Sequence, residues 1–448
     1  MMLKRAALMC LAALLLALPA QAAADANYEA RAQAVVAGLT RLNGLKGWEA
    51  PSDWPPLPAD FNRLRRETGR TVLGAAFSPG RPARLTALAL VGAGLARSAD
   101  LSGLTALTAL DLSANRLTGL NLAGNEALTT LAVLKNQLSA LDLASSPRLT
   151  ALDLSGNELA RLDLSANPLL TELNLSRNKL TELDLRGGRA LARLEVTGNL
   201  LTSLDISTHP DLTLLKAAYN RIAALDLSAQ PLLTGLDLRG NALTSLDLGQ
   251  NPALRELAVG RNRLAGLDLG HNPDLTRLEA EKNRLTRLDL KHCRRLEILE
   301  VPGNPLTQIH IAPEAPLVSL NLDGGRLPLS HLAPLTGRAR DRTRFGRQTR
   351  VFFETRALDL REELDLSAEA EFGGVPTEFR VLDEKGRRRE PSYYSLENGR
   401  LRFNVPGRYQ VEMTNPQVFS SERGGSGSTP RLRRVKARAV TGIIEVSP

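Results

Sequence analysis

Residues 149–169 have the sequence LTALDLSGNELARLDLSANPL, and this pattern recurs along the middle of the chain. Units of 21 residues begin at Leu107 and at every twenty-first residue up to Leu317, and a 22-residue unit at Leu85 precedes them. Most units carry leucine, or otherwise another apolar residue, at positions 1, 4 and 6, and again at 11, 14 and 16. The chain therefore contains about twelve copies of one short structural unit.

A period of about 20–29 residues with the spacing L-x-x-L-x-L-x-x-N is the signature of leucine-rich repeats. A single unit cannot bury its leucines, but stacked neighbours bury them in one continuous core. We therefore predict a right-handed solenoid with a parallel β-sheet on its concave face. Because 21 residues leave little room for a helix, we expect extended or 3₁₀ segments on the opposite wall.

Position 9 is asparagine in ten successive units. Its amide carries donors and acceptors, so stacked copies can satisfy turn backbone groups of neighbouring coils. We interpret this column as a structural ladder, formed by Asn115, Asn136, Asn157, Asn178, Asn199, Asn220, Asn241, Asn262, Asn283 and Asn304. Position 19 is more variable, with asparagine in four units, His209, Gln230 and Cys293.

The doubled LTxLDLS half-repeats resemble those of bacterial internalins, especially the internalin J class, in which a cysteine or asparagine column lines one turn. Cys293 lies at the looser turn position, so this chain uses mainly polar residues there. The resemblance covers residues 85–337 and implies a secreted or surface-exposed ligand-binding protein. The chain departs from the family in having no wall-sorting motif.

Two regions flank the repeats. Lys4 and Arg5 precede an apolar run over 8–18 and the small residues Ala20-Gln21-Ala22, a pattern typical of a secretory signal peptide. Alternating apolar and polar residues after 350 predict a β-sandwich, and PGRYQVEMTN around Tyr409 resembles a late strand of bacterial immunoglobulin-like domains. We expect a signal peptide at 1–22, an N-terminal cap containing Trp48 and Trp54 at 23–84, the array at 85–337, a basic solvated linker at 338–350 and an immunoglobulin-like sandwich at 351–448.

The formal net charge of +9 is unevenly distributed. Residues 338–448 hold 22 basic and 16 acidic side chains, a net charge of +6, so the basicity belongs to the tail. Export and the scarcity of interleaved aromatics argue against nucleic acid as a partner. No apolar segment after the leader reaches the ~20 residues that span a membrane. We expect an exported monomer that is periplasmic, cell-surface or extracellular, without membrane insertion.

Known catalytic and cofactor motifs are absent from the sequence. There is no phosphate-binding glycine loop, no H-E-x-x-H and no G-x-S-x-G. Cys10 and Cys293 are the only cysteines, and Cys10 falls within the leader. Aspartates recur in two columns, one of them running from Asp142 to Asp289, but the glycine-rich calcium nonapeptide is missing. We predict no enzymatic activity, no cofactor and no metal.

Positions 3, 5, 7 and 8 of each unit are predicted to face solvent on the concave side. Many of these positions carry Ala, Asp, Ser or Gly, but particular units carry larger or charged residues there. Tyrosine and arginine are common interface anchors. Tyr219 is the only aromatic residue between Phe77 and Phe345. The candidate ligand-binding residues are Leu134, Lys135, Lys216, Tyr219, Arg239, Arg261, Arg277, Glu279, Glu281 and Lys282.

The sequence therefore predicts a non-enzymatic binding protein that recognises a protein or a glycan through this face. The alternative is a structural envelope scaffold that interacts through the basic C-terminal sandwich.

Overall fold

The computed structural model describes residues 72–77, 85–92, 95–102, 104–336, 338–339, 342–345, 347–351, 357–360, 362–372, 374–424, 431–441 and 443–447. The expected signal peptide and most of the expected cap, including Trp48 and Trp54, lie outside these residues. The chain divides into two compact units, residues 1–230 and 231–448.

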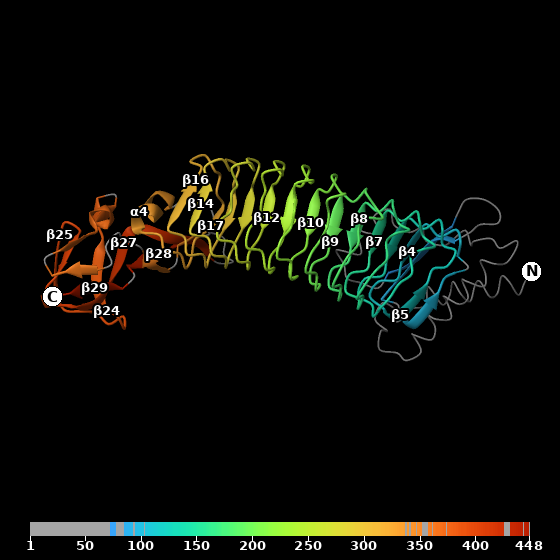
Figure 1. Cartoon of the computed structure of the whole chain (residues 1–448), viewed down its shortest axis with the longest axis horizontal. Helices are drawn as coiled ribbons and strands as arrows, with labels where there is room; N and C mark the ends of the chain where they lie inside the picture. Colours follow the sequence, from blue (N-terminus) through green and yellow to red (C-terminus); the bar gives the residue numbers. More distant parts are fainter. Residues whose placement is uncertain are drawn as a thin grey trace, which may run out of the picture. The chain divides into compact units, whose positions relative to one another are not determined.

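The first unit is a stack of coils, each contributing one short strand to a parallel sheet (Figure 1). The strands pair in sequence order, with leucine facing leucine in the register, for example Leu152 with Leu173. They are β2 (Leu85–Val91), β4 (Ala109–Asp111), β6 (Thr130–Ala132), β7 (Ala151–Asp153), β8 (Glu172–Asn174), β9 (Arg193–Glu195) and β10 (Leu214–Lys216). Strand β1 (Val72–Phe77), from the expected cap region, pairs antiparallel with β2 and covers the first edge of this sheet.

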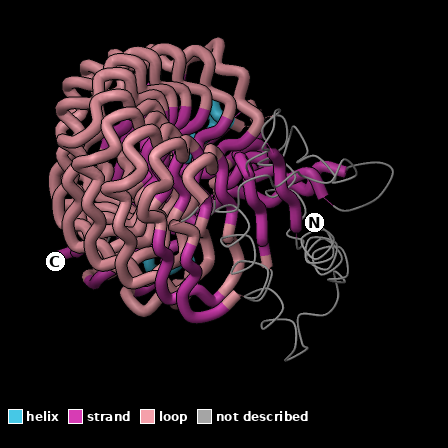
Figure 2. The backbone as a smooth tube through the Cα atoms, turned by 90° about the vertical axis from the view of Figure 1, so that its right-hand side faces the viewer, coloured by secondary structure: helices cyan, strands magenta, loops and turns pink. Residues whose placement is uncertain are grey.

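The repeats of the second unit form the same kind of sheet. Its parallel strands are β11 (Gly235–Asp237), β12 (Glu256–Ala258), β13 (Arg277–Glu279), β15 (Ile298–Glu300), β17 (Ser319–Asn321) and β18 (Arg342–Arg344). On the opposite wall, two parallel pairs stand among turns: β3 (Ala96–Asp100) with β5 (Arg116–Asn121), and β14 (Arg287–Leu290) with β16 (Gln308–Ile311). Figure 2 shows the strands gathered on one wall and loops making most of the other. The predicted leucine-rich-repeat solenoid with little helix is confirmed.

The leucines of each coil form the core. In the coil that begins at Leu149, the side chains at positions 1, 4, 6 and 11 are at most 2% exposed. The corresponding leucines of the other coils are buried in the same way. Burial of one leucine contributes about 1.5–3 kcal/mol, so each added coil stabilises its neighbours strongly.

The position 9 asparagines connect each coil to the one before it. Asn199 is 5% exposed, and its Oδ1 accepts the Leu180 N–H at 3.1 Å. Its Nδ2 donates to the Leu175 carbonyl at 2.9 Å and to the Val196 carbonyl of its own coil at 3.0 Å. The same three contacts recur at Asn136, Asn157 and Asn178.

A second buried column lies at position 19 on the other side of each coil. Asn167 donates from Nδ2 to the Leu143 and Ser146 carbonyls, and Asn272 makes the equivalent pair of bonds in the second unit. Cys293 occupies the same place, with its Sγ 3.8–3.9 Å from two carbonyl oxygens. Its thiol is fully buried, and burial raises its pKa to about 11. The thiol is therefore a weak donor in a backbone turn rather than a nucleophile.

The C-terminal part of the second unit is built almost entirely of strands. They are β19 (Arg347–Val351), β20 (Ala357–Asp359), β21 (Glu363–Asp365), β22 (Glu371–Phe372), β23 (Val375–Pro376), β24 (Glu378–Asp383), β25 (Tyr394–Glu397), β26 (Arg400–Phe403), β27 (Gly407–Gly424), β28 (Arg431–Thr441) and β29 (Ile444–Ser447). Short helical turns occur at α4 (Leu329–Leu332), η1 (Ala333–Leu335), η2 (Ser367–Glu369) and η3 (Pro391–Tyr393). Strand β27 is the centre of this region, because it pairs antiparallel with β18, β24, β28 and β29.

The stretch 338–350, expected to be a solvated linker, contributes a strand to the repeat sheet. β18 pairs parallel with β17 and antiparallel with β27, so one sheet continues from the repeats into the C-terminal strands. Thr343 and Phe345 are fully buried. The buried Glu369 carboxylate also accepts the Ser330 N–H of α4 at 3.0 Å. The arginines at this boundary therefore alternate with side chains that fill the core.

We predict that Asn199→Ala lowers the free energy of unfolding by about 1–3 kcal/mol, because one N–H and two carbonyls in adjacent coils lose their buried partner. Chemical denaturation monitored by circular dichroism measures this loss. Thr202→Ala, an exposed change in the same coil, is the control and should leave stability unchanged. Equal stability of Asn199→Ala and the wild type would contradict a structural role for the column.

A second prediction concerns His209, the histidine of the position 19 column. It is 1% exposed, and burial lowers the pKa of its imidazole. The folded chain thus keeps His209 neutral at a pH where the unfolded chain binds a proton, so stability falls as the pH drops below about 6.5. His209→Asn, which introduces the residue found at this position in other coils, should remove that part of the pH dependence. Melting temperatures of both proteins between pH 7.5 and 5 test this; parallel curves would contradict it.

Candidate ligand-binding surface

The outer face of each parallel sheet is formed by positions 3, 5 and 7 of the coils. In strand β13, for example, Arg277 and Glu279 flank the buried Leu278 on either side. The floor between the larger side chains is made of small residues, such as Ala258 and Gly260 in the neighbouring coil. The leucine core fixes this face, while its own residues are free to differ from coil to coil.

Position 8, which in most coils lies three residues after the strand, has an unusual backbone conformation. All twelve residues at this position, from Gly92 to Gly324, have φ between 54° and 77°. The N–H group of position 8 donates to the position 7 carbonyl of the next coil, as in Lys135 N–H to Ser155 O at 2.7 Å. A left-handed residue here keeps the strand ladder while it turns the following asparagine into the core. This conformation costs an ordinary side chain about 1–2 kcal/mol, and glycine avoids that cost.

In the first unit, the predicted residues occupy different environments. Leu134 is half-buried, Lys135 is exposed, and Tyr219 is 53% exposed. Lys216 forms an ion pair with Glu195 of the adjacent strand, with 3.2 Å between Nζ and Oε1. Tyr219 is therefore an exposed aromatic side chain three residues after a paired lysine.

In the second unit, a charged cluster spans three coils. Arg239 forms a two-pronged contact with Asp237, at 2.9 Å from Nε and 2.6 Å from Nη2, and reaches Glu279 at 3.2 Å. Glu279 also accepts hydrogen bonds from Arg277. Arg239 crosses the intervening coil over its small side chains. Such a network orders its members more strongly than isolated surface pairs.

The remaining predicted residues of the second unit lie beside this cluster. A side chain at Gly260 would collide with the Glu281 carboxylate, so Glu281 lies directly over that glycine. Arg261 and Lys282 are exposed at left-handed positions. The structure thus brings together Arg239, Arg277 and Glu279. Tyr219 belongs to the first unit.

Sequence reasoning missed several residues of this face. Arg177 is exposed at position 8, and Glu195 and Asp237 are the partners of two predicted cations. Arg177 could have been found, because it lies 42 residues, or two periods, from both Lys135 and Tyr219.

Comparison of structures relates this fold to known solenoids. The internalin InlF of Listeria monocytogenes is 24% identical, with 57% of this chain and 78% of that chain covered and a TM-score of 0.51. A chain of the LRIM1/APL1C complex is 20% identical, with coverages of 67% and 60% and a TM-score of 0.51. The functional domain of InlJ from Listeria monocytogenes is 22% identical, with coverages of 81% and 91% and a TM-score of 0.45.

The fold is a leucine-rich-repeat solenoid. No family model matches the sequence, and no curated protein is significantly similar to it in sequence. The stacked coils of such solenoids present an extended surface, which proteins of this fold use for binding. No helix in the described part of the chain has the length and apolarity needed to cross a membrane.

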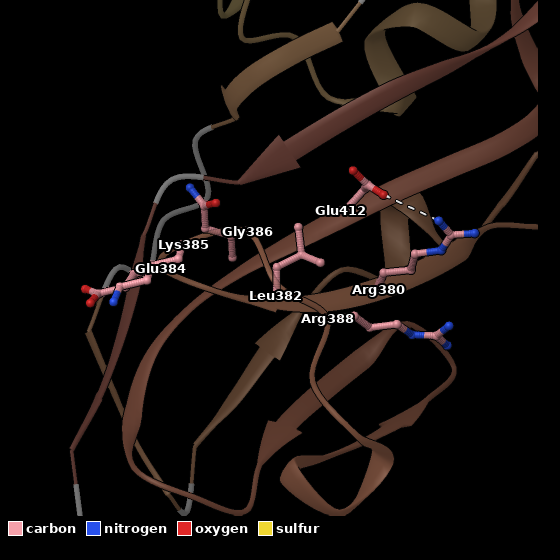
Figure 3. A pocket seen from close by; sticks show the side chains of 8 residues that line it. Arg380, Leu382, Glu384, Lys385, Gly386, Arg388 and Glu412 are labelled. Atoms are coloured by element: carbon pink, nitrogen blue, oxygen red, sulfur yellow. Dashed lines mark ion pairs between the residues drawn. The ribbon is translucent and has the colours of Figure 1, made fainter.

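The C-terminal region of this leucine-rich-repeat protein holds an open pocket of about 600 Å³ between β24, the turn after it and β27 (Figure 3). Its walls are mostly charged. Arg380 forms a 3.8 Å ion pair with the buried Glu412, while Lys385 and Arg388 extend from the turn into solvent. The mixed charges and wide opening suit a surface contact better than capture of a small molecule.

The aspartates of the repeats have backbone partners. In the column of Asp142, Asp163, Asp184, Asp205, Asp226, Asp247, Asp268 and Asp289, each Oδ1 accepts the N–H two residues later at 2.9–3.1 Å. Such turns are a common structural use of aspartate. Hydrogen bonds from Arg186 lower the pKa of Asp184 to about 2. Among the described residues, no group of three His, Cys, Asp or Glu side chains is placed to hold a metal ion.

We therefore predict that calcium does not contribute to stability, since the carboxylates already accept hydrogen bonds from the backbone. Thermal melting with 5 mM calcium and with excess chelator should give the same midpoint. Asp184→Asn melted under both conditions serves as a comparison. A large fall on chelation in the wild type, reduced in this variant, would show that the aspartate column binds metal.

Proposed function

We propose that this protein is an exported, non-enzymatic binding protein that recognises a protein or glycan ligand through the outer face of its repeat sheet. The observation that carries the proposal is Tyr219, an aromatic side chain 53% exposed at a position where the backbone favours glycine. Folding does not explain such a residue, whereas exposed tyrosines are frequent anchors of interfaces.

Several further observations support this function. The leader-like sequence of residues 1–22 supports export. One structural neighbour was solved as the LRIM1/APL1C complex, which supports a protein partner for this kind of scaffold. In the C-terminal region the Tyr409 hydroxyl donates to the Val405 carbonyl at 2.9 Å, an arrangement like the tyrosine corner of immunoglobulin-type sandwiches. We accordingly propose an immunoglobulin-like module there.

We predict that Tyr219→Ala weakens ligand binding at least about tenfold, because truncating a central aromatic anchor typically costs about 2 kcal/mol or more. The melting temperature should not fall, since Ala114 occupies the same left-handed position in another coil. The measurement is surface plasmon resonance of the full chain against a panel of purified glycans and extracellular proteins. Arg221→Ala, an exposed change two residues away, is the matched control.

The alternative function is a structural scaffold that interacts through the C-terminal module. The basic balance of residues 338–448 and the open pocket favour it. The same panel distinguishes the two functions through Lys385→Glu/Arg388→Glu, which reverses two exposed charges of the pocket. If this variant loses binding and Tyr219→Ala binds like the wild type, the contact belongs to the C-terminal module.

A further inference from the structure

The cations at the left-handed position 8 have no ion-pair partner among the described residues, whereas most of the predicted cations at positions 3, 5 and 7 are paired. Lys135 and Arg177 in the first unit are exposed, and neither has an ion-pair partner among the residues that the structure describes. In contrast, carboxylates of the same face hold three cations at positions 3, 5 and 7, namely Lys216, Arg239 and Arg277, while Arg193 on β9 is exposed without an ion pair in the described residues. Arg261 and Lys282, at the left-handed position of the second unit, are also exposed without such a partner in the described residues.

Glycine alternates with the large side chains in the first unit. Position 8 runs Lys135, Gly156, Arg177, Gly198 and Tyr219 in successive coils, all with positive φ. The Cγ of Lys135 lies 3.5 Å from where a side chain at Gly156 would begin, and the Cγ of Arg177 lies 3.6 Å from the same point at Gly198. Each stem thus leans over the bare backbone of the next coil. The charged ends repeat at every second coil, about 10 Å apart at the strand spacing of a parallel sheet.

Structural needs do not account for this row. Glycine satisfies the left-handed backbone in six other coils, and no carboxylate of the described residues pairs with either cation. Residues that keep a less favourable backbone conformation without an internal partner are candidates for external contacts. Lysine and arginine make their strongest hydrogen bonds with carboxylate, sulfate and phosphate oxygens. Tyr219, which continues the spacing, offers an exposed ring with a polar tip.

We propose that Lys135, Arg177 and Tyr219 form a linear row that binds an anionic polysaccharide lying along the stack of coils, with the cations on its acidic groups and the ring against a sugar. This inference rests on the proposed function and specifies the ligand class of the first unit. The regular two-coil spacing favours a repeating polymer over a folded protein surface, and a ring beside cations favours a sugar acid over a plain acidic peptide.

The test uses the full chain and a defined probe, an alginate oligosaccharide, in calorimetric titrations at low salt. Lys135→Gly/Arg177→Gly should weaken binding at least tenfold while the melting temperature stays equal or rises, because glycine is the natural residue of this position. Tyr219→Ala should weaken binding further when it is added. Arg148→Ala/Arg161→Ala removes the same charge from other exposed positions of the first unit and should change affinity less than twofold.

Several results would contradict the proposal that this row binds an anionic polysaccharide. The first is that the wild type does not bind alginate. The second is that it binds neutral dextran, polyglutamate or oligothymidylate as tightly as alginate. The third is that the Arg148→Ala/Arg161→Ala control loses as much alginate affinity as the double glycine variant. A lower melting temperature of the double glycine variant would assign the two cations a structural role instead. A neutral ligand that loses affinity in Tyr219→Ala would keep the proposed function and reject the row, whereas a panel in which no ligand responds to Tyr219→Ala would reject both.

Discussion

A single coil of 21 residues cannot form a hydrophobic core by itself, and the rest of the structure depends on this constraint. Its six leucines become buried only when another coil covers them, so the period must be kept from unit to unit. The asparagine amide at position 9 enforces the register, because its three hydrogen bonds join two coils and one of its partners is the N–H on the far side of the turn. A shift of one residue in the register between neighbouring coils would leave both the buried amide and its backbone partners without hydrogen bonds.

The same constraint destabilises the two ends of the array unless they are covered. The last coil would expose both its leucines and an unpaired strand edge. Here β18 covers that edge, and the long strand β27 pairs with β18 in turn, so the repeat sheet passes into the C-terminal strands. The buried contact between Glu369 and Ser330 holds a second point of this junction. The C-terminal strands therefore complete the core of the second unit.

The period, the inward leucines and the parallel sheet could all be predicted from the sequence, because each is repeated about twelve times and every copy obeys the same packing rule. The boundary at 338–350 could not. Its arginines suggested exposure to solvent. In a strand, however, successive side chains point to opposite faces, and here Thr343 and Phe345 are the buried ones. On the outer face the sequence identified which positions are free, yet it could not tell a paired cation such as Arg239 from one such as Lys135, which has no ion-pair partner among the described residues. That difference depends on partners two coils away, as Glu279 is from Arg239.

The positions of the outer face do not tolerate substitution equally. A large side chain therefore has a different interpretation at position 8 than at positions 3, 5 and 7. At positions 3, 5 and 7 any residue that suits an extended strand is accepted, so an ion pair there can serve stability alone. At position 8 every large side chain bears a backbone cost that glycine would remove. A solenoid selected for stability alone would place glycine at each such turn, as it does at Gly156, Gly198 and Gly240. The residues that persist there against this cost are the ones for which contacts outside the chain give the simplest physical reason.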